Sequence, residues 1–394
     1  MRFRRLWLWL CVAAPALAIW APMGQPVPVE RAIANVQAQL QTSPKDASAW
    51  LTLARLHSYA FFTGQPQVPM RNGKAYFSNL PHATPAKEPT AGSLAHLKES
   101  IAAFRKSISL DGNVPLAYLG LAWDLGQGAP YAGRIGAIPG EEGLAAKPSQ
   151  WTERALENYR QAYDRAAKNE LAMIGLPPGF EAISGEAAEG IIAIDEQRLK
   201  DSKRDQGDLQ AEIARMKQSM TKMAQKPRAV TPIIFSFEER ASLRDLTTDD
   251  VQVNFDLDGF GGSRWTWLKP ATGILVWDPA RTGVVQSGLQ LFGPVTWWMF
   301  WRDGYQALAA LDDNHDGWLS GAELRGLAVW IDRNQNGRSD AGEVIPVEDA
   351  GIVRIGVTAA RDTEGTLGNA QGIEFSDGRR TPSFDWVSRG QAIR

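Results

Sequence analysis

Two twelve-residue segments near the C-terminal end place oxygen-bearing side chains at one repeated spacing. They run from 312 to 323 and from 332 to 343, and each begins with aspartate and ends with glutamate. The sixth residue of each is a glycine, Gly317 or Gly337, which lets the chain turn sharply. The side-chain oxygens come from Asp312, Asn314, Asp316, Ser320 and Glu323 in the first, and from Asp332, Asn334, Asn336, Asp340 and Glu343 in the second. Several oxygens around one turn are what a hard cation such as Ca²⁺ requires.

Both segments resemble the EF-hand calcium loop. That resemblance implies that the position-7 carbonyls of Trp318 and Arg338 each add a ligand and that Glu323 and Glu343 bind with both oxygens. Ser320 or Asp340 would act directly or through water. Asp/Asn/Gly clusters also make turns without metal, but a turn alone does not account for a glutamate six residues after the glycine, twice. We therefore expect two Ca²⁺ ions. The second loop departs from the pattern at position 8, where Ser339 replaces the usual apolar residue.

The beginning of the chain has the pattern of an export signal. A basic start is followed by an apolar run and an Ala-Leu-Ala pattern at 16–18, which predicts a signal peptide over 1–18. An uncleaved anchor is the alternative, although the apolar run is shorter than the ~20 residues that span a bilayer. After cleavage no membrane span is expected. The prediction is an exported protein that is periplasmic, cell-surface or secreted.

Cysteine and charge narrow the class of protein. The single cysteine, Cys11, lies in the predicted signal, so the mature chain has no disulfide and no thiol catalysis. With 42 basic and 44 acidic residues, no bulk charge favours nucleic acid as a partner. Each loop carries three carboxylates, which predicts dissociation constants on the order of 10⁻⁵ to 10⁻³ M. Such affinities indicate structural sites rather than signalling sensors.

The stretch 27–226 has helical periodicity. Segments 49–54 (AWLTLA) and 116–122 (LAYLGLA) look like first helices of tetratricopeptide repeats, and 101–111 and 155–163 resemble second helices. The resemblance implies an array of helical hairpins with a concave face for a partner protein or peptide. Gly/Pro-rich insertions at 62–92 and 125–150 break the 34-residue period, so generic helical packing remains the alternative. The isolated His57, His82 and His96 have no metal-ligand spacing and are expected to be packed or solvated.

A stripe of apolar residues ends the helical half. Leu209, Ile213, Met216, Met220 and Met223 recur at steps of four and three, which predicts one face of a helix. We expect that face to cover the last repeat; a short coiled-coil dimer is the alternative. The helix should end at 226–227, where Pro227 cannot continue it, and we place the domain boundary there.

The stretch 231–390 changes to short apolar runs separated by Gly and Asp. Residues 233–237, 251–255, 273–277 and 352–357 are predicted as strands, and 373–375 with 383–386 as a terminal hairpin. The order of its motifs, from FDLDG at 255–259 to GYQALAALD at 304–312, resembles the EF-hand-bearing, haemolysin-type calcium-binding module of bacterial secreted and surface proteins. The fold class expected for the whole chain is therefore mostly α with a C-terminal α+β module.

Two further turns depart from that family's pattern. Phe260 stands where an aspartate is usual after Asp256 and Asp258, and the loop beginning at Asp278 has Gln290 in place of an acidic residue. With ligands replaced by neutral groups, both are interpreted as loops that keep the turn and lose the ion.

The two intact loops are separated only by residues 324–331. Leu324, Leu327, Ala328 and Ile331 fall at i, i+3, i+4 and i+7, which predicts one short helix that leaves the first loop and enters the second. Metal at both ends would order so short a helix.

Tryptophans are concentrated in this half, and we expect them to form a core rather than a sugar-binding platform. The favoured function is a calcium-binding exported protein without enzyme activity, whose helical half mediates protein contacts. The alternative is a carbohydrate-binding or carbohydrate-active protein, or a hydrolase, with a site between the halves.

Overall fold

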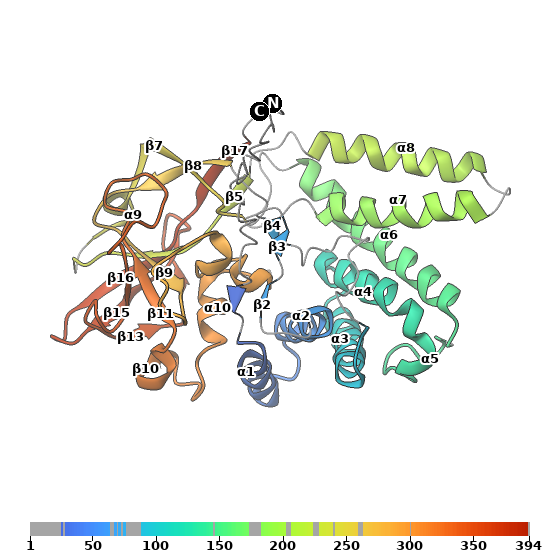
Figure 1. Cartoon of the computed structure of the whole chain (residues 1–394), viewed down its shortest axis with the longest axis horizontal. Helices are drawn as coiled ribbons and strands as arrows, with labels where there is room; N and C mark the ends of the chain where they lie inside the picture. Colours follow the sequence, from blue (N-terminus) through green and yellow to red (C-terminus); the bar gives the residue numbers. More distant parts are fainter. Residues whose placement is uncertain are drawn as a thin grey trace, which may run out of the picture.

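The computed structural model describes residues 25–26, 28–63, 67–68, 70–71, 74–75, 88–144, 146–172, 183–201, 206–223, 228–238, 241–258, 263–299 and 301–392. Among the described residues, helices predominate up to Met223 and strands from Arg228 onward, which confirms a helical N-terminal half and a C-terminal sheet module. The two parts lie beside each other, and α1 and α10 face one another where they meet (Figure 1). The predicted signal peptide and most of the 62–92 insertion lie outside the described residues.

Successive helices of the first half pack on one another, α1 on α2, α2 on α3, α4 on α6, α6 on α7 and α7 on α8. Their bounds are α1 Val29–Thr42, α2 Ala47–Thr63, α3 Ala91–Leu110, α4 Pro115–Gly128, α5 Ala132–Ile135, α6 Pro148–Ala172, α7 Ile183–Asp201 and α8 Gln206–Met223, with a 3₁₀ turn η1 at Ala129–Tyr131. All four segments that resemble repeat helices are helical. Two short strand pairs, β1 (Gln25–Pro26) with β2 (Gln67–Val68) and β3 (Met70–Arg71) with β4 (Lys74–Ala75), precede α3.

Glycines allow these helices to approach closely. A Cβ on Gly120 would lie 2.2 Å from the ring of Phe104, and one on Gly190 would lie 2.6 Å from the ring of Tyr159. Large rings therefore fill the space that the small residues leave.

The predicted apolar stripe of α8 is partly buried, because Ile213 and Met216 lie in the core.

The second half is built on antiparallel sheets. A nine-stranded sheet has the order β10-β13-β15-β16-β6-β9-β11-β12, with β14 paired to β15, and a four-stranded sheet has the order β5-β17-β8-β7. The bounds are β5 Arg228–Val230, β6 Ile233–Phe235, β7 Thr247–Phe255, β8 Ser263–Leu268, β9 Gly273–Trp277, β10 Trp318–Ser320, β11 Leu327–Trp330, β12 Val344–Pro346, β13 Ile352–Gly356, β14 Ala360–Arg361, β15 Leu367–Phe375, β16 Arg380–Asp385 and β17 Ser388–Ala392. The predicted hairpin is present as β15 and β16, with Ile373 opposite Thr381.

Short helical turns connect these strands: α9 Leu243–Leu246, η2 Gly288–Gln290, η3 Thr296–Trp298, α10 Gly304–Ala309 and η4 Gly321–Leu324. Tryptophans fill the core of the module, as expected. Trp265, Trp267, Trp297 and Trp330 are fully buried, and Trp277, Trp301 and Trp386 nearly so.

The predicted helix between the two loops is wrong. After the short turn η4, Gly326 adopts φ +91°, and Leu327–Trp330 continues as strand β11, paired with β9 and β12. All four residues of β11 are buried. A run that is apolar on every face suits a central strand, and in eight residues the helical spacing cannot be distinguished from such a run. The loops are thus joined by a buried strand that is paired on both sides, and no helix-ordering role for metal remains.

Candidate calcium-binding loops

The two loops share one backbone conformation. The carboxylate of Asp312 accepts a hydrogen bond from the N–H of Gly317 at 3.0 Å, and Asp332 accepts from Gly337 at 2.8 Å. The fourth residue of each loop, His315 or Gln335, has φ +57°, and both sixth-position glycines also have positive φ. The glycine expected from the sequence therefore provides both the sharp turn and the N–H that anchors the first aspartate.

The third and fifth positions form a second set of turns. The side-chain oxygen of Asn314 accepts from the N–H of Asp316 at 2.9 Å, and that of Asn334 accepts from Asn336 at 3.1 Å. These residues lie on the exposed side of each loop. Asp340 is also exposed and accepts from the side-chain amides of Asn334 and Asn336 at 2.7 and 2.8 Å, and these bonds lower its pKa. Three candidate ligands of the second loop are thus in mutual contact.

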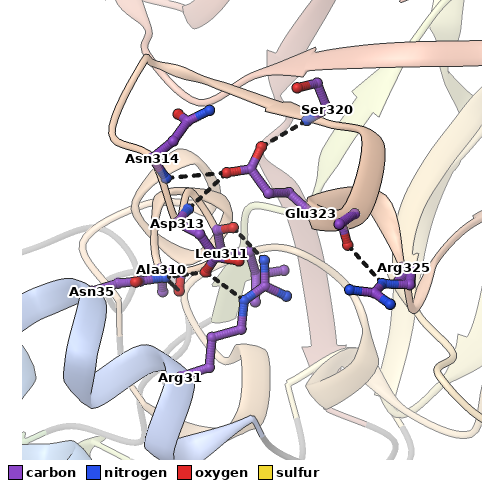
Figure 2. A network of polar contacts seen from close by, with 10 residues as sticks. Arg31, Asn35, Ala310, Leu311, Asp313, Asn314, Ser320, Glu323 and Arg325 are labelled. Carbon is purple, nitrogen blue, oxygen red and sulfur yellow. Dashed lines mark hydrogen bonds and ion pairs between the residues drawn. The ribbon is translucent and has the colours of Figure 1, made fainter.

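A buried glutamate closes each loop. Glu323 accepts from the N–H groups of Asp313 at 2.8 Å and Ser320 at 3.0 Å (Figure 2). Glu343 accepts from Arg333 at 2.9 Å and Asp340 at 3.1 Å. Each carboxylate therefore ties the second position of its loop to the ninth.

The first aspartate of each loop, Asp312 or Asp332, is a buried carboxylate. Asp312 is 4% exposed, and its Oδ1 has no hydrogen-bond partner in the structure. Burial raises the pKa of Asp312 and of Asp332, although hydrogen bonds from Gly317 and Gly337 oppose the rise. A buried carboxylate oxygen without a donor is costly. A cation inside the loop would remove that cost, so the residues of the first loop fit Ca²⁺.

The second loop is held by the module around it. The indole N–H of Trp267 donates to Oδ2 of Asp332 at 2.6 Å, and the amide of Gln335 donates to the carbonyl of Leu268 at 2.7 Å. Both partners belong to β8. Oδ1 of Asp332 accepts the N–H of Asn336 at 3.1 Å. Trp267 is a supporting residue that no local pattern in the sequence could identify, because it lies 65 residues before its partner.

The remaining candidate ligands are the backbone carbonyls of Trp318 and Arg338, each of which directly follows the glycine of its loop. The ring of Trp318 is half-buried, and the guanidinium of Arg354 lies 4.6 Å from its centre. Within the described residues, no group of three or more His, Cys, Asp or Glu side chains is gathered as a metal site. The candidate loops draw on amide, hydroxyl and carbonyl oxygens as well as carboxylates.

The loop at Asp278 has the same turn. Asp278 accepts the N–H of Gly283 at 2.8 Å, Arg281 at its fourth position has φ +52°, and Gly283 has φ +68°. Gln290 takes the closing role, because its Oε1 accepts from Gln286 at 2.7 Å while its Nε2 donates to the carbonyl of Val284 at 3.1 Å. A donor thus occupies the seventh carbonyl, which an EF-hand loop turns toward the ion. The expected turn is thus present; residues 259–262, in the other turn that departs from the pattern, are outside the described residues.

The loop that begins at Asp278 lies against the second candidate loop. The N–H of Val285, at position 8 of the one, donates to Oγ of Ser339, at position 8 of the other, at 2.8 Å. Position 8 of the first loop is Leu319, which is buried in β10 and pairs with Ile355 of β13. The hydroxyl of Ser339, which replaces the usual apolar residue, thus has a specific partner.

The helical half contains polar groups that the sequence alone did not place together. His57 and His96, expected to be isolated, have their Nδ1 atoms 2.9 Å apart. Nearby, Asp124 is fully buried and accepts from Ser58 at 2.6 Å and from Ser100. Burial raises the pKa of Asp124 to about 7, and it lowers the pKa of His57 to about 4 with a further contribution from His96.

A polar cleft of about 1060 Å³ lies between the halves, and Asp303 and Asp385 line it. Such a cleft is what the hydrolase alternative requires. Burial raises the pKa of Asp385 to about 7, and the charge of Asp303 adds to this. Both carboxylates support the start of α10, since Asp303 accepts from Gln306 at 2.9 Å and Asp385 from Gly304 at 3.4 Å. Their hydrogen bonds are those of a helix start.

Among the described residues, no helix is long and apolar enough to cross a membrane.

A comparison with protein families finds similarity in the module. Residues 241–386, which contain all three loops, match the family model described as SPM domain. A segment of 108 residues is 37% identical to the iron-regulated protein FrpA of Neisseria meningitidis serogroup C, and this covers 26% of the present chain and 10% of FrpA. The chain thus spans about a tenth of the length of that curated relative, and the match describes one part of each protein.

Proposed function

We propose that the sheet module binds two Ca²⁺ ions, one in the loop 312–323 and one in the loop 332–343, and that these ions stabilise its fold. The observation that carries the proposal is the buried Oδ1 of Asp312, which has no hydrogen-bond partner and begins a loop with an EF-hand ligand pattern. Each ion offsets the repulsion among three carboxylates and the cost of burying the first and last of them.

We propose that the role of these ions is structural. Each loop is continuous with a strand of the large sheet, and the strand between them, β11, is buried and paired on both sides. A sensor would need helices that can swing apart, and the segment between these loops is a strand. The module is proposed to have no enzyme activity of its own, since its buried acids accept hydrogen bonds from backbone groups.

The helical half is the proposed site of protein contacts, in the manner of tetratricopeptide repeats. Its successive helix pairs support this, because stacked pairs leave an extended face. An exported location, where calcium is plentiful, fits the affinity expected of the loops. A pull-down from a cell extract, with calcium or with EGTA, tests whether the helical half binds a partner protein. Capture of no specific protein in either condition would count against this role.

Isothermal titration of calcium tests the sites. Wild type should take up two ions with dissociation constants on the order of 10⁻⁵ to 10⁻³ M. Glu323→Gln and Glu343→Gln should each lose one ion, and the double variant both. Glu364→Gln is the matched control, since the Glu364 side chain is 73% exposed and lies outside the loops. Absence of calcium uptake by the folded wild type would refute the proposal.

Stability gives a second readout. A site with a dissociation constant of about 10⁻⁵ M should add about 2.7 kcal/mol at about 1 mM free calcium, and one of about 10⁻⁴ M about 1.4 kcal/mol. An unchanged melting temperature between EGTA and calcium, with the sites filled, would remove the structural role while leaving binding intact.

A further inference from the structure

The first loop is also the place where the helical half holds the sheet module. Arg31 and Asn35 lie one turn apart on α1 and both reach the loop entrance (Figure 2). Nε of Arg31 lies 2.7 Å from Oδ1 of Asp313, and Nδ2 of Asn35 donates to the same oxygen at 2.9 Å. Two residues of one helix face thus converge on loop position 2.

The same two side chains bind the backbone before the loop. Arg31 donates to the carbonyl of Leu311 at 2.6 Å, and Asn35 donates to that of Ala310 at 2.9 Å. These carbonyls follow directly after α10, where the last carbonyls of a helix have no partner within the helix. The cationic Arg31 suits this end of the helix dipole.

Asp313 connects this contact with the ion site. Its side chain faces Arg31 and Asn35, while its backbone N–H donates to the closing carboxylate of Glu323 at 2.8 Å. It directly follows Asp312, whose unpartnered oxygen is the first candidate ligand. Whatever fixes Glu323 and Asp312 therefore fixes the peptide that presents Asp313 to α1.

The other hydrogen bonds between the described parts of the halves are longer. The remaining hydrogen bonds between the described parts of the helices and the module run from Gln306 to Ser48 and Thr52, both at 3.4 Å. Cavities of about 1060 and 330 Å³ flank the contact. An interface with such gaps depends on its few strong polar contacts.

We propose that calcium in the loop 312–323 controls the docking of α1, and with it the helical half, on the sheet module. This inference depends on the proposed function. With the ion bound, Asp312 and Glu323 are held, and the loop offers one carboxylate and two carbonyls in a fixed arrangement. Without the ion, repulsion among the loop carboxylates loosens that arrangement, and the halves separate. The second loop contacts only the module through its described bonds and serves as the internal control.

Distances between spin labels in the full chain test this. One label goes on Lys106→Cys in α3 and one on Asp349→Cys, both at exposed positions, with Cys11→Ser to remove the native thiol. With calcium, wild type and Glu343→Gln should give one narrow distance distribution. With EGTA, or in Glu323→Gln with calcium, the distribution should broaden toward longer distances. Equal broadening in Glu343→Gln would overturn the proposal, because docking would then follow module stability rather than the first loop.

A charge-neutral variant tests the contact from the helical side. Arg31→Leu with Asp313→Asn removes one positive and one negative charge and changes neither candidate ligands nor net charge. It should give the broad distribution even with calcium, and the affinity of the first loop for calcium should fall at least about fivefold by reciprocal coupling. Unchanged distances and affinity would overturn the proposal.

Calcium titrations on the same samples separate the two ideas. If no calcium binds, the proposed function fails. If the first loop fills while the distance distribution stays narrow in both EGTA and calcium, only the docking inference fails.

Discussion

The side-chain amide of Gln290 donates to the carbonyl of Val284 at 3.1 Å, where an EF-hand loop would turn its seventh carbonyl toward the ion. Gln290 is 4% exposed, and its other amide atom closes the loop onto Gln286. A side-chain donor thus occupies this carbonyl, and the hydrogen bonds of Gln290 close this third loop.

Replacing Gln290 with glutamate should make this loop unstable. Gln290→Glu puts a carboxylate oxygen against the carbonyl of Val284 and buries a charge, which should cost about 2 kcal/mol or more in EGTA. Urea unfolding measures the loss. Gln371→Glu makes the same change at an exposed position and should be nearly neutral; equal costs in the two variants would contradict the assignment.

The bond from Trp267 to Asp332 predicts a second difference. Trp267→Phe removes the donor to the buried carboxylate, whereas Trp330→Phe removes an indole N–H that has no hydrogen-bond partner in the structure. Both rings are fully buried, so the loss of volume is matched. In EGTA, Trp267→Phe should be less stable than Trp330→Phe by about 1–3 kcal/mol. Equal stabilities by chemical denaturation would show that the bond contributes nothing.

Two glycines on α4 should respond in opposite directions to alanine. A Cβ on Gly120 would lie 2.2 Å from the ring of Phe104, whereas one on Gly126 meets nothing within 4 Å. Gly120→Ala should cost about 1–3 kcal/mol through overpacking. Gly126→Ala should add about 0.5–1 kcal/mol, because alanine loses less backbone freedom on folding. Thermal unfolding of the two variants decides; stabilisation by Gly120→Ala would mean that α3 and α4 pack less closely.

The buried Asp124 predicts a pH effect in the helical half. Burial raises its pKa from the ordinary 3.8 to about 7, against the opposing bonds from Ser100 and Ser58. A carboxyl group with a raised folded-state pKa contributes stability that is present below the unfolded pKa and is lost as pH rises to the folded one. Wild type should therefore lose stability from this group between about pH 3.8 and about pH 7.

Asp124→Asn keeps an oxygen that can accept from Ser58 and places an NH2 group that can donate to the Ser100 hydroxyl, and it should lack this loss. The stability of the variant relative to wild type should increase from pH 5 to pH 8, by an amount on the order of a few kcal/mol. Denaturant unfolding at both pH values measures it. Comparing the two chains removes the contribution of His57, whose lowered pKa acts in the opposite direction. A pH-independent difference would mean that Asp124 is not protonated in the folded chain.

Much of the fold follows from local pattern. The periodicity of 116–122 placed a helix, and the continuous apolar run 273–277 gave β9 with its observed bounds. Residues 324–331 were predicted as a helix because Leu324, Leu327 and Ile331 share a helical spacing. The segment forms a strand instead of a helix because β9 and β12 supply backbone hydrogen-bond partners on both sides of β11. Neither neighbour can be inferred from the spacing.

For the candidate loops too, some features follow from the sequence and others from the tertiary structure. The sequence by itself determined the oxygen pattern, the glycine turn and the closing glutamates, since these lie within twelve residues and depend on local backbone geometry. Only the tertiary structure decided that Trp267 supports Asp332, that Ser339 meets Val285, and that Arg31 binds Asp313 across 282 residues of chain. Such partners are chosen by how the sheets and helices pack, and no spacing within a segment specifies that packing.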